Sequence, residues 1–196
     1  LTIQSYTPFK RALQGHRAKL RDRDIEVIEK RVEGISHITP VLFAQSGTRG
    51  MVSHRSQVTF TNIYGIGPSY LEVNSVFPQR GRFFTPEDES RRRLVCTVGP
   101  DVLEELEMPE DSIGEFIRLG GDWCKIVGVM EKRGEIFGFS QDNYILMPYA
   151  TAKRLMGASR DLDIQIQLLV DDLNRMDEVK DRIRQVLRRE HRLGAG

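Results

Sequence analysis

Residues that commonly carry chemistry are thinly spread in this 196-residue chain. Its four histidines, His16, His37, His54 and His191, lie far apart. None has a second His or a Cys at the spacing that places two metal ligands on one element. The sequence therefore predicts no metal site, and we expect the histidines to be ordinary exposed polar side chains.

The densest group of carboxylates is Glu87-Asp88-Glu89, which could in principle supply a general acid and a general base. It directly follows Thr85-Pro86. A Thr cap, a Pro in the first turn and acids after it are typical of a helix start, because acids there interact favourably with the helix dipole. We predict helix capping rather than catalysis for these residues.

Loops that bind phosphates or activate a nucleophile are also missing from the sequence. It contains no G-x-S-x-G elbow, no Gly-Lys-Ser/Thr phosphate loop and no G-x-G-x-x-G after a strand, and Gly65-Ile66-Gly67 is typical of a turn. We predict no catalytic residue, no cofactor-binding residue and no cofactor, and therefore no enzymatic activity in this chain.

The charges are nearly balanced, with 29 Lys and Arg against 28 Asp and Glu. A dedicated nucleic-acid binder needs a net basic surface, so we expect no nucleic-acid partner. The basic run "SRRRL", at Ser90–Leu94, has acidic neighbours, and we expect it to be a solvated loop.

The two cysteines, Cys96 and Cys124, lie in the apolar segments "LVCTV" and "DWCKIVGV". Cys is among the most buried residues, so one interpretation is a pair of buried free thiols. A disulfide is the other, and it requires Cα atoms within about 7 Å, which adjacent strands could supply. The sequence leaves both open.

Two aromatic pairs stand in polar surroundings. Phe137 and Phe139 flank a glycine in "EIFGFSQDN", and they indicate either an exposed tip that docks a partner or a loop packed against the core. For Phe83 and Phe84 in "RGRFFTPED", strand geometry predicts that one ring points into the core and supports the fold, while its neighbour points out. Gly81 is expected to permit a turn before them.

The elements that must position these residues follow from periodicity and turn signals. Asp22 or Asp24 is expected to cap a helix that contains Ile28 and stops at Gly34. Residues 45–56 are polar and punctuated by glycine, and predict a hairpin tip. The expected strands are 1–6, 35–44, 57–66, 94–98, 116–119, 123–130, 144–147 and 164–170, and the other expected helices start near 70, 100, 150 and 176.

This order predicts an α+β fold. Strand–helix units at the two ends of the chain are expected to share one sheet, with a strand-rich segment inserted between them. We therefore predict a porter-like α+β lobe from residues 1–67 and 149–196, and an inserted strand-rich lobe from residues 68–148.

The longest apolar run is Ile126–Met130, far below the roughly 20 residues of a membrane-spanning helix. The chain begins at Leu1 without a secretion signal, and we expect it to be a segment of a longer protein. Its Gly194-Ala195-Gly196 end fits either a native linker or an added sequence.

A resemblance rests on an ordered set of motifs, each weak alone. They are "SYLEVNSVFPQRGRFFTPED", "RLVCTVGPDVLEELE", "SIGEFIRLGGDWCKIVGVMEKRG" and "FGFSQDNYILMPYATAKRLMG". In this order the chain resembles the MacB-like periplasmic core domain of ABC-transporter permeases, a family that includes FtsX-like and lipoprotein-releasing relatives. The resemblance extends from about Leu1 to Arg192. One departure is Leu106-Glu107-Met108-Pro109, where the family has "LF" and an acidic segment.

What the resemblance implies is a non-catalytic periplasmic domain of an inner-membrane permease that functions in export. The domain would relay conformational change or dock a periplasmic adaptor protein. Its other partners would be the membrane-embedded remainder of the permease and a nucleotide-binding domain, fused or separate, that hydrolyses ATP. The alternative is a module that binds a hydrophobic ligand or a lipoprotein, as in a lipoprotein-releasing permease. The exported substrate and the adaptor are not specified by the sequence.

The resemblance also implies that the parent permease works as a dimer. The sequence shows no obvious exposed apolar patch of the kind that a stable interface needs. We therefore expect the isolated chain to be a monomer at micromolar concentration.

Overall fold

The structure is a computed structural model that describes residues 1–4, 19–43, 50–137, 139–155 and 164–191. The strands are β1 (Thr2–Ile3), β2 (Ile35–Phe43), β3 (Met51–His54), β4 (Gln57–Phe60), β5 (Asn62–Ile66), β6 (Pro78–Gly81), β7 (Val95–Val98), β8 (Phe116–Leu119), β9 (Asp122–Met130), β10 (Glu135–Ile136), β11 (Phe139–Ser140), β12 (Tyr144–Pro148) and β13 (Gln165–Val170). The helices are α2 (Asp22–Arg31), α3 (Tyr70–Asn74), α4 (Pro86–Ser90), α5 (Pro100–Glu105), α6 (Tyr149–Leu155) and α7 (Met176–Glu190), with a 3-10 turn, η1 (Leu173–Arg175), before α7.

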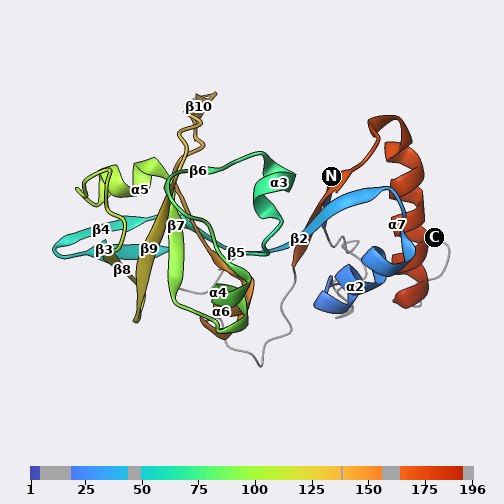
Figure 1. Ribbon diagram of the computed structural model, residues 1–196, viewed down its shortest axis with the longest axis horizontal. Coiled ribbons are helices and arrows are strands. Elements are labelled where there is room, and N and C mark those ends of the chain that lie inside the picture. Colours follow the sequence, from blue (N-terminus) through green and yellow to red (C-terminus); the bar gives the residue numbers. More distant parts are fainter. Residues whose placement is uncertain (5–18, 44–49, 138, 156–163, 192–196) are drawn as a thin grey trace, which may run out of the picture.

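One mixed sheet of 11 strands runs through the molecule (Figure 1). Its strand order is β1-β13-β2-β5-β12-β7-β9-β8-β3-β4, and β6 pairs with β9 beside this path. The pairs β5–β12 and β7–β9 are parallel, and the other pairs are antiparallel. The predicted α+β class is confirmed.

The two ends of the chain meet in this sheet, as the order of elements predicts. β1 pairs with β13, β13 pairs with β2, and α2 and α7 pack against each other at that end of the molecule (Figure 1). Ile28 of α2 is buried, and so are Val179 and Ile183 of α7, which share one face of that helix because they are four positions apart. The start of α2 differs from expectation: Arg21 is the cap residue, and its N–H donates to Asp24 Oδ2 at 2.8 Å.

Strand β12 lies at the centre of the sheet order, between β5 and β7. Its side chains alternate between the two faces of the sheet, so Ile145 and Met147 enter the main core while Leu146 enters a second cluster with Val41 and Met130. Helix α6 follows β12 directly, and the Tyr149 hydroxyl donates to Asp22 Oδ1 of α2 at 2.5 Å. This contact joins the middle of the sheet to the terminal helices.

The hairpin tip predicted for residues 45–56 is wrong in part. Residues 45–49 lie outside the described residues, but Met51–His54 form strand β3, which pairs with β4 and, on its other side, with β8. The turn between β3 and β4 is Arg55-Ser56, with φ of +53° at Arg55. It contains neither Gly nor Asn, the usual sequence signals for such a turn, and so escaped detection. The division into lobes 1–67 with 149–196 and 68–148 stays a prediction. Strand β3 of the first segment pairs with β8 of the second, so the sheet continues across the expected boundary.

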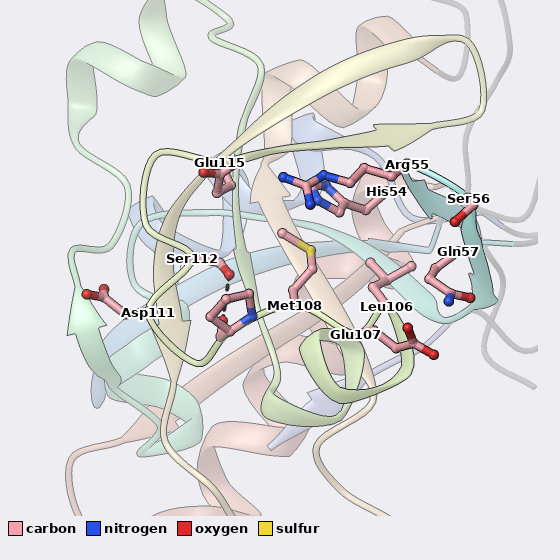
Figure 2. Close-up of a pocket in the computed structure, with 11 residues that line it drawn as sticks. His54, Arg55, Ser56, Gln57, Leu106, Glu107, Met108, Asp111, Ser112 and Glu115 are labelled. Atoms are coloured by element: carbon pink, nitrogen blue, oxygen red, sulfur yellow. Dashed lines mark hydrogen bonds between the residues drawn. The ribbon is translucent and has the colours of Figure 1, made fainter.

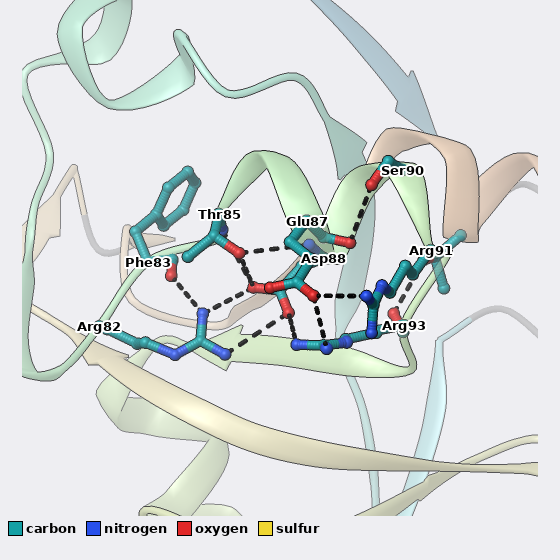
Figure 3. Close-up of polar contacts among 9 residues, drawn as sticks. Arg82, Phe83, Thr85, Glu87, Asp88, Ser90, Arg91 and Arg93 are labelled. Atoms are coloured by element: carbon teal, nitrogen blue, oxygen red, sulfur yellow. Dashed lines mark hydrogen bonds and ion pairs between the residues drawn. The ribbon is translucent and has the colours of Figure 1, made fainter.

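The carboxylate of Asp88 accepts hydrogen bonds from Arg82, Thr85 and Arg93, at the end of the segment "RGRFFTPED" and just beyond it (Figure 3). Its backbone N–H donates to Thr85 Oγ1 at 3.2 Å, and its Oδ2 accepts from the Thr85 N–H at 3.0 Å, which completes the predicted helix cap. Its carboxylate also accepts from Arg82 Nη1 at 2.6 Å and Arg93 Nη1 at 3.3 Å. The side chain is fully buried, so this carboxylate ties the end of β6 to α4 and to the segment before β7.

The pKa of Asp88 follows from this environment. Burial by itself raises the pKa, but the hydrogen bonds from Arg82 and Thr85 outweigh burial and lower the pKa from 3.8 to about 2. A carboxyl whose pKa is lower in the folded chain stabilises the fold above its ordinary pKa and loses that effect as the pH falls through the folded value.

The expectation that only one of Phe83 and Phe84 faces the core is wrong. Both rings are half-buried against the second cluster, and they contact each other with centroids 4.5 Å apart. The reason is that β6 ends at Gly81, so the two residues are not in a strand and need not alternate. Gly81 has φ of +71°, and a Cβ there would lie 2.3 Å from the Val127 carbonyl oxygen, which confirms the predicted turn.

Replacing Asp88 by Asn is expected to lower the free energy of unfolding at pH 7 by about 2–3 kcal/mol, because a buried charge-assisted network and a cap are weakened. From pH 5 to 2 the wild-type chain should lose about 2 kcal/mol more than Asp88→Asn. Denaturant titrations across this range measure both effects. Glu110→Gln is the control, since Glu110 pairs with Arg80 while its side chain is 88% exposed. An unchanged pH profile in Asp88→Asn would contradict the assignment.

For the aromatic pair, Phe83→Ala and Phe84→Ala are each expected to cost about 2 kcal/mol of folding free energy, since half-buried rings lose part of what a fully buried Phe loses. Urea titration should show similar losses for both variants and almost none for the control Phe137→Ala, whose side chain is 96% exposed. A large loss at one position and none at the other would instead support the original expectation that one ring points into the core and the other points out.

Candidate functional site

Strands β10 and β11 form a separate two-stranded hairpin that projects from the body of the molecule (Figure 1). At its tip Phe137 is 96% exposed and has a backbone φ of +52°, a conformation that is uncommon outside glycine. The neighbouring Ile136 is 55% exposed. Large apolar side chains at a projecting tip are typical of partner contacts rather than of internal packing.

The base of this hairpin is held by Asp142, which the sequence analysis missed. Its Oδ1 and Oδ2 accept hydrogen bonds from the N–H groups of Arg133 and Gly134, both at 2.8 Å, and the side chain is buried. The Asp142 N–H in turn donates to Ser140 Oγ at 2.9 Å. The tip is therefore carried on a fixed stem. The motif "SQDN" is a common turn composition, so its role was not apparent from residue types alone.

The two sequence-predicted docking residues have different outcomes. For Phe137, the alternative of a ring packed against the core is wrong, because the ring is almost fully exposed. Phe139 lies in β11, and its side chain is outside the described part of the chain. The hairpin thus presents one described aromatic anchor, Phe137, beside Ile136.

A cavity of about 340 Å³ lies between the β3–β4 turn and the segment that joins α5 to β8 (Figure 2). Leu106, Met108 and Pro109 contribute its apolar lining. Its polar lining comes from His54, Arg55, Ser56, Gln57, Glu107, Asp111, Ser112 and Glu115. Figure 2 shows Asp111, Glu107 and Glu115 on different sides of the cavity, so they do not converge on a common point. This arrangement is not that of an acid–base pair.

The histidines that the sequence analysis considered as metal ligands lie on separate elements. His37 lies in β2, and His54 Nδ1 lies 3.1 Å from the Phe116 carbonyl oxygen. His191 Nε2 lies 2.7 Å from Asp24 Oδ1, while His16 is outside the described residues. Across the described ranges, no group of three or more His, Cys, Asp or Glu side chains is placed to hold a metal ion.

Cys96 and Cys124 are free, buried thiols on the paired strands β7 and β9. Burial raises the pKa of Cys96 well above its usual range, and a hydrogen bond with Cys124 raises it further. The Cys96 thiol therefore remains protonated and unreactive at neutral pH. Of the two interpretations left open by the sequence, the structure has the free thiols.

The exposed apolar surface is larger than the sequence indicated. Val58 and Phe60 of β4, Phe116 of β8 and Trp123 of β9 are each about half exposed or more. They occupy alternate positions on neighbouring strands, beside buried residues. The expectation that no apolar patch is exposed is therefore wrong, because residue order does not show which face of a sheet is left uncovered. In the part of the chain that is described, no helix has the length and apolar character needed to cross a membrane.

The fold is shared with the extracellular domain of an ABC-type transporter and with the periplasmic region of a MacB protein. It superposes on the extracellular domain of the transporter YknZ from Gram-positive bacteria with a TM-score of 0.78 and 19% identity, covering 97% of this chain and 95% of that one. The periplasmic region of MacB from Actinobacillus actinomycetemcomitans gives a TM-score of 0.77 and 19% identity, with 97% and 83% covered.

The sequence identifies the family. Residues 1–186 match the family described as the MacB-like periplasmic core domain, and the chain belongs to it. It is 29% identical to a macrolide export ATP-binding/permease protein MacB of Bdellovibrio bacteriovorus over 91% of this chain and 27% of that protein. It is 30% identical to a probable syringafactin export ATP-binding/permease protein SyfD of Pseudomonas syringae, over 74% and 22% respectively. The chain thus spans about a quarter of the length of these relatives.

Proposed function

We propose that this chain is the periplasmic domain of an inner-membrane export permease and that its β10–β11 tip docks a periplasmic adaptor protein. The observation that carries the docking role is the 96% exposure of Phe137 on a hairpin whose base is fixed by Asp142. Exposed aromatic residues make a large contribution to binding when a partner covers them. A fixed stem lowers the ordering cost of that contact.

In this proposal the domain transmits movement as a connected body. The sheet is continuous from β1 to β4, and Tyr149 links its middle to α2. A displacement at the chain ends can then move the tip without local unfolding. The ends would lead into the membrane-embedded remainder of a permease that works as a dimer. ATP hydrolysis would belong to a nucleotide-binding domain outside this chain.

The alternative, a module for a hydrophobic ligand or a lipoprotein, has less support. A ligand of that kind needs a concave apolar lining, whereas the cavity near Met108 is lined largely by polar and charged side chains. The exposed apolar residues, such as Phe60 and Trp123, lie on a sheet face instead. The exported substrate is not specified by these features.

The docking role is tested by immobilising candidate periplasmic adaptor proteins of the source organism and measuring the binding of this chain to each. Phe137→Ser is expected to weaken binding at least about tenfold in an immobilised-adaptor assay, since an anchor residue commonly contributes more than 1 kcal/mol. Leu173→Ser is the matched control, because Leu173 is also apolar and 75% exposed but lies before α7. Equal affinities for the two variants, or no binding by the wild-type chain, would contradict the proposal.

The isolated chain is expected to remain a monomer at low micromolar concentration. Its exposed apolar residues on β4, β8 and β9 lie among charged side chains such as Arg118 and Lys125. A stable interface, in contrast, commonly buries about 1,600 Å² around an apolar centre. Sedimentation velocity at several loadings measures this. A stable dimer at about 5 µM would require an interface of standard size and would show that the exposed surfaces combine into one.

A further inference from the structure

The two faces of the sheet are covered to different extents. On one face, helices α2, α5, α6 and α7 all contribute buried residues to the main core. The other face carries the second cluster, against which Tyr70 and Leu71 of α3 pack. Strands β8, β3 and β4 continue the sheet beyond this cluster, at the end of the molecule opposite α2 and α7 (Figure 1).

The side chains of β4, β3, β8 and the adjoining part of β9 can be assigned to these two faces. Ile117 and Cys124 lie opposite each other and are buried in the main core. Thr59 points to the same side, where α5 packs against β4 and the Thr59 hydroxyl donates to the Glu105 carboxylate. Alternate residues point to the other side, which we call the outer face. The outer-face residues are Met51, Ser53, Val58, Phe60, Phe116, Arg118, Trp123 and Lys125.

The outer face combines aromatic rings with cations. Phe60, Phe116 and Trp123 are each about half exposed or more, and Arg118 and Lys125 are also exposed. Arg118 lies opposite Trp123 and Phe116 lies opposite Lys125, so rings and cations alternate across β8 and β9. Neither cation forms an ion pair with another residue in the described ranges. No Asp or Glu occupies an outer-face position, so the charge of this surface is not neutralised within it.

This composition favours contact with an anionic lipid surface. Trp side chains prefer the boundary between the headgroups and the acyl chains of a bilayer, and Lys and Arg are attracted to anionic headgroups. Strands β4, β3, β8 and β9 lie side by side over about 15 Å. None of the outer-face residues lines the cavity near Met108. The rings and cations are therefore presented on a sheet surface, and a second copy of this face would bring like charges together.

We propose that the outer face binds the surface of a bilayer that contains anionic phospholipids. In this contact, the rings of Trp123, Phe116 and Phe60 enter the headgroup region, and Arg118 and Lys125 contact lipid phosphates. The contact does not involve Phe137, which lies on the separate β10–β11 hairpin. It is therefore independent of the docking of an adaptor protein.

The contact has a geometrical consequence for the proposed permease parent, and this consequence alone rests on that proposal. The chain ends lie at one end of the long axis of the molecule, and β3, β4 and β8 lie at the other (Figure 1). Attachment at both ends would hold the long axis of the domain along the bilayer. Few side chains are involved, so the contact is expected to be weak and reversible. Tethering to the membrane would raise its occupancy.

Trp123 is the sole tryptophan of the chain and is 54% exposed, so its fluorescence reports directly on the outer face. The test is a titration of the whole 196-residue chain with vesicles of phosphatidylcholine that contain about 30% phosphatidylglycerol. Its emission is expected to shift to shorter wavelengths as the ring leaves water, and lipids with brominated acyl chains should quench it. Vesicles of phosphatidylcholine alone should have little effect. Raising the salt from about 0.1 M to about 0.5 M should weaken binding, because salt screens the cations.

The double variant Arg118→Gln/Lys125→Gln is expected to lower the affinity for the anionic vesicles by about fivefold for each cation removed. The matched control is Arg154→Gln/Arg189→Gln, which removes the same charge from exposed positions on α6 and α7. This control should bind almost as the wild-type chain does. All of these variants keep Trp123, so the same emission can be followed in each.

Two further variants separate the outer face from the hairpin tip. Phe60→Ser should weaken vesicle binding severalfold, whereas Phe137→Ser should leave it unchanged, although both rings are exposed. Loss of binding in Phe137→Ser, or equal losses in the two double variants, would overturn the proposal, as would unchanged Trp123 emission with anionic vesicles. A shift caused by an adaptor protein and not by vesicles would make a protein the occupant and would also overturn it. Tip docking is measured on immobilised adaptors without lipid, so the two failures are distinguishable.

Discussion

Strand β12 is the element through which the two halves of the sheet are joined. It pairs in parallel with β5 and antiparallel with β7, and its residues Ile145, Leu146 and Met147 are all buried. Because alternate side chains enter opposite faces, this short strand contributes to both apolar clusters at once. Removing β12 would break its ladders with β5 and β7 and would expose both clusters. A cooperative body of this size is what a domain needs if movement at its termini is to reach a distant surface.

Two segments at the surface of the domain are held by buried carboxylates rather than by apolar packing alone. Asp142 fixes the stem of the β10–β11 hairpin through two backbone N–H groups, and Asp88 fixes the turn after β6 through Arg82 and Arg93. A buried carboxylate must satisfy its oxygens, so it specifies the positions of the donors around it. The tip itself has no such constraint, and Phe137 remains exposed.

The two exposed surfaces of the domain have different physical characters. The tip presents one ring on a narrow hairpin, which suits insertion into a pocket of another protein. Strand β4 instead presents two exposed apolar side chains, Val58 and Phe60, on one face of the sheet.

Local rules determined much of the fold from the sequence. Periodicity and capping signals predicted a helix around Ile28 and another that starts near residue 176, which are α2 and α7, and Thr85-Pro86 predicted the start of α4. The strands expected at 116–119 and 123–130 correspond to β8 and β9. The ordered motifs also identified the family. These features depend on residues within a few positions of each other, where capping, turn geometry and periodicity act.

Tertiary structure decided what depends on distant residues. Nothing near Met51 in the chain indicates that β3 pairs with β8, because that pairing is formed by residues about 65 positions further along. The capping role of Asp88 is local, but its full burial requires the fold around it. The exposure of Phe60 and Phe137 and the burial of both Phe83 and Phe84 likewise depend on which surfaces other elements cover. A sequence pattern predicts which way each side chain points, but only the tertiary packing decides whether another element covers it.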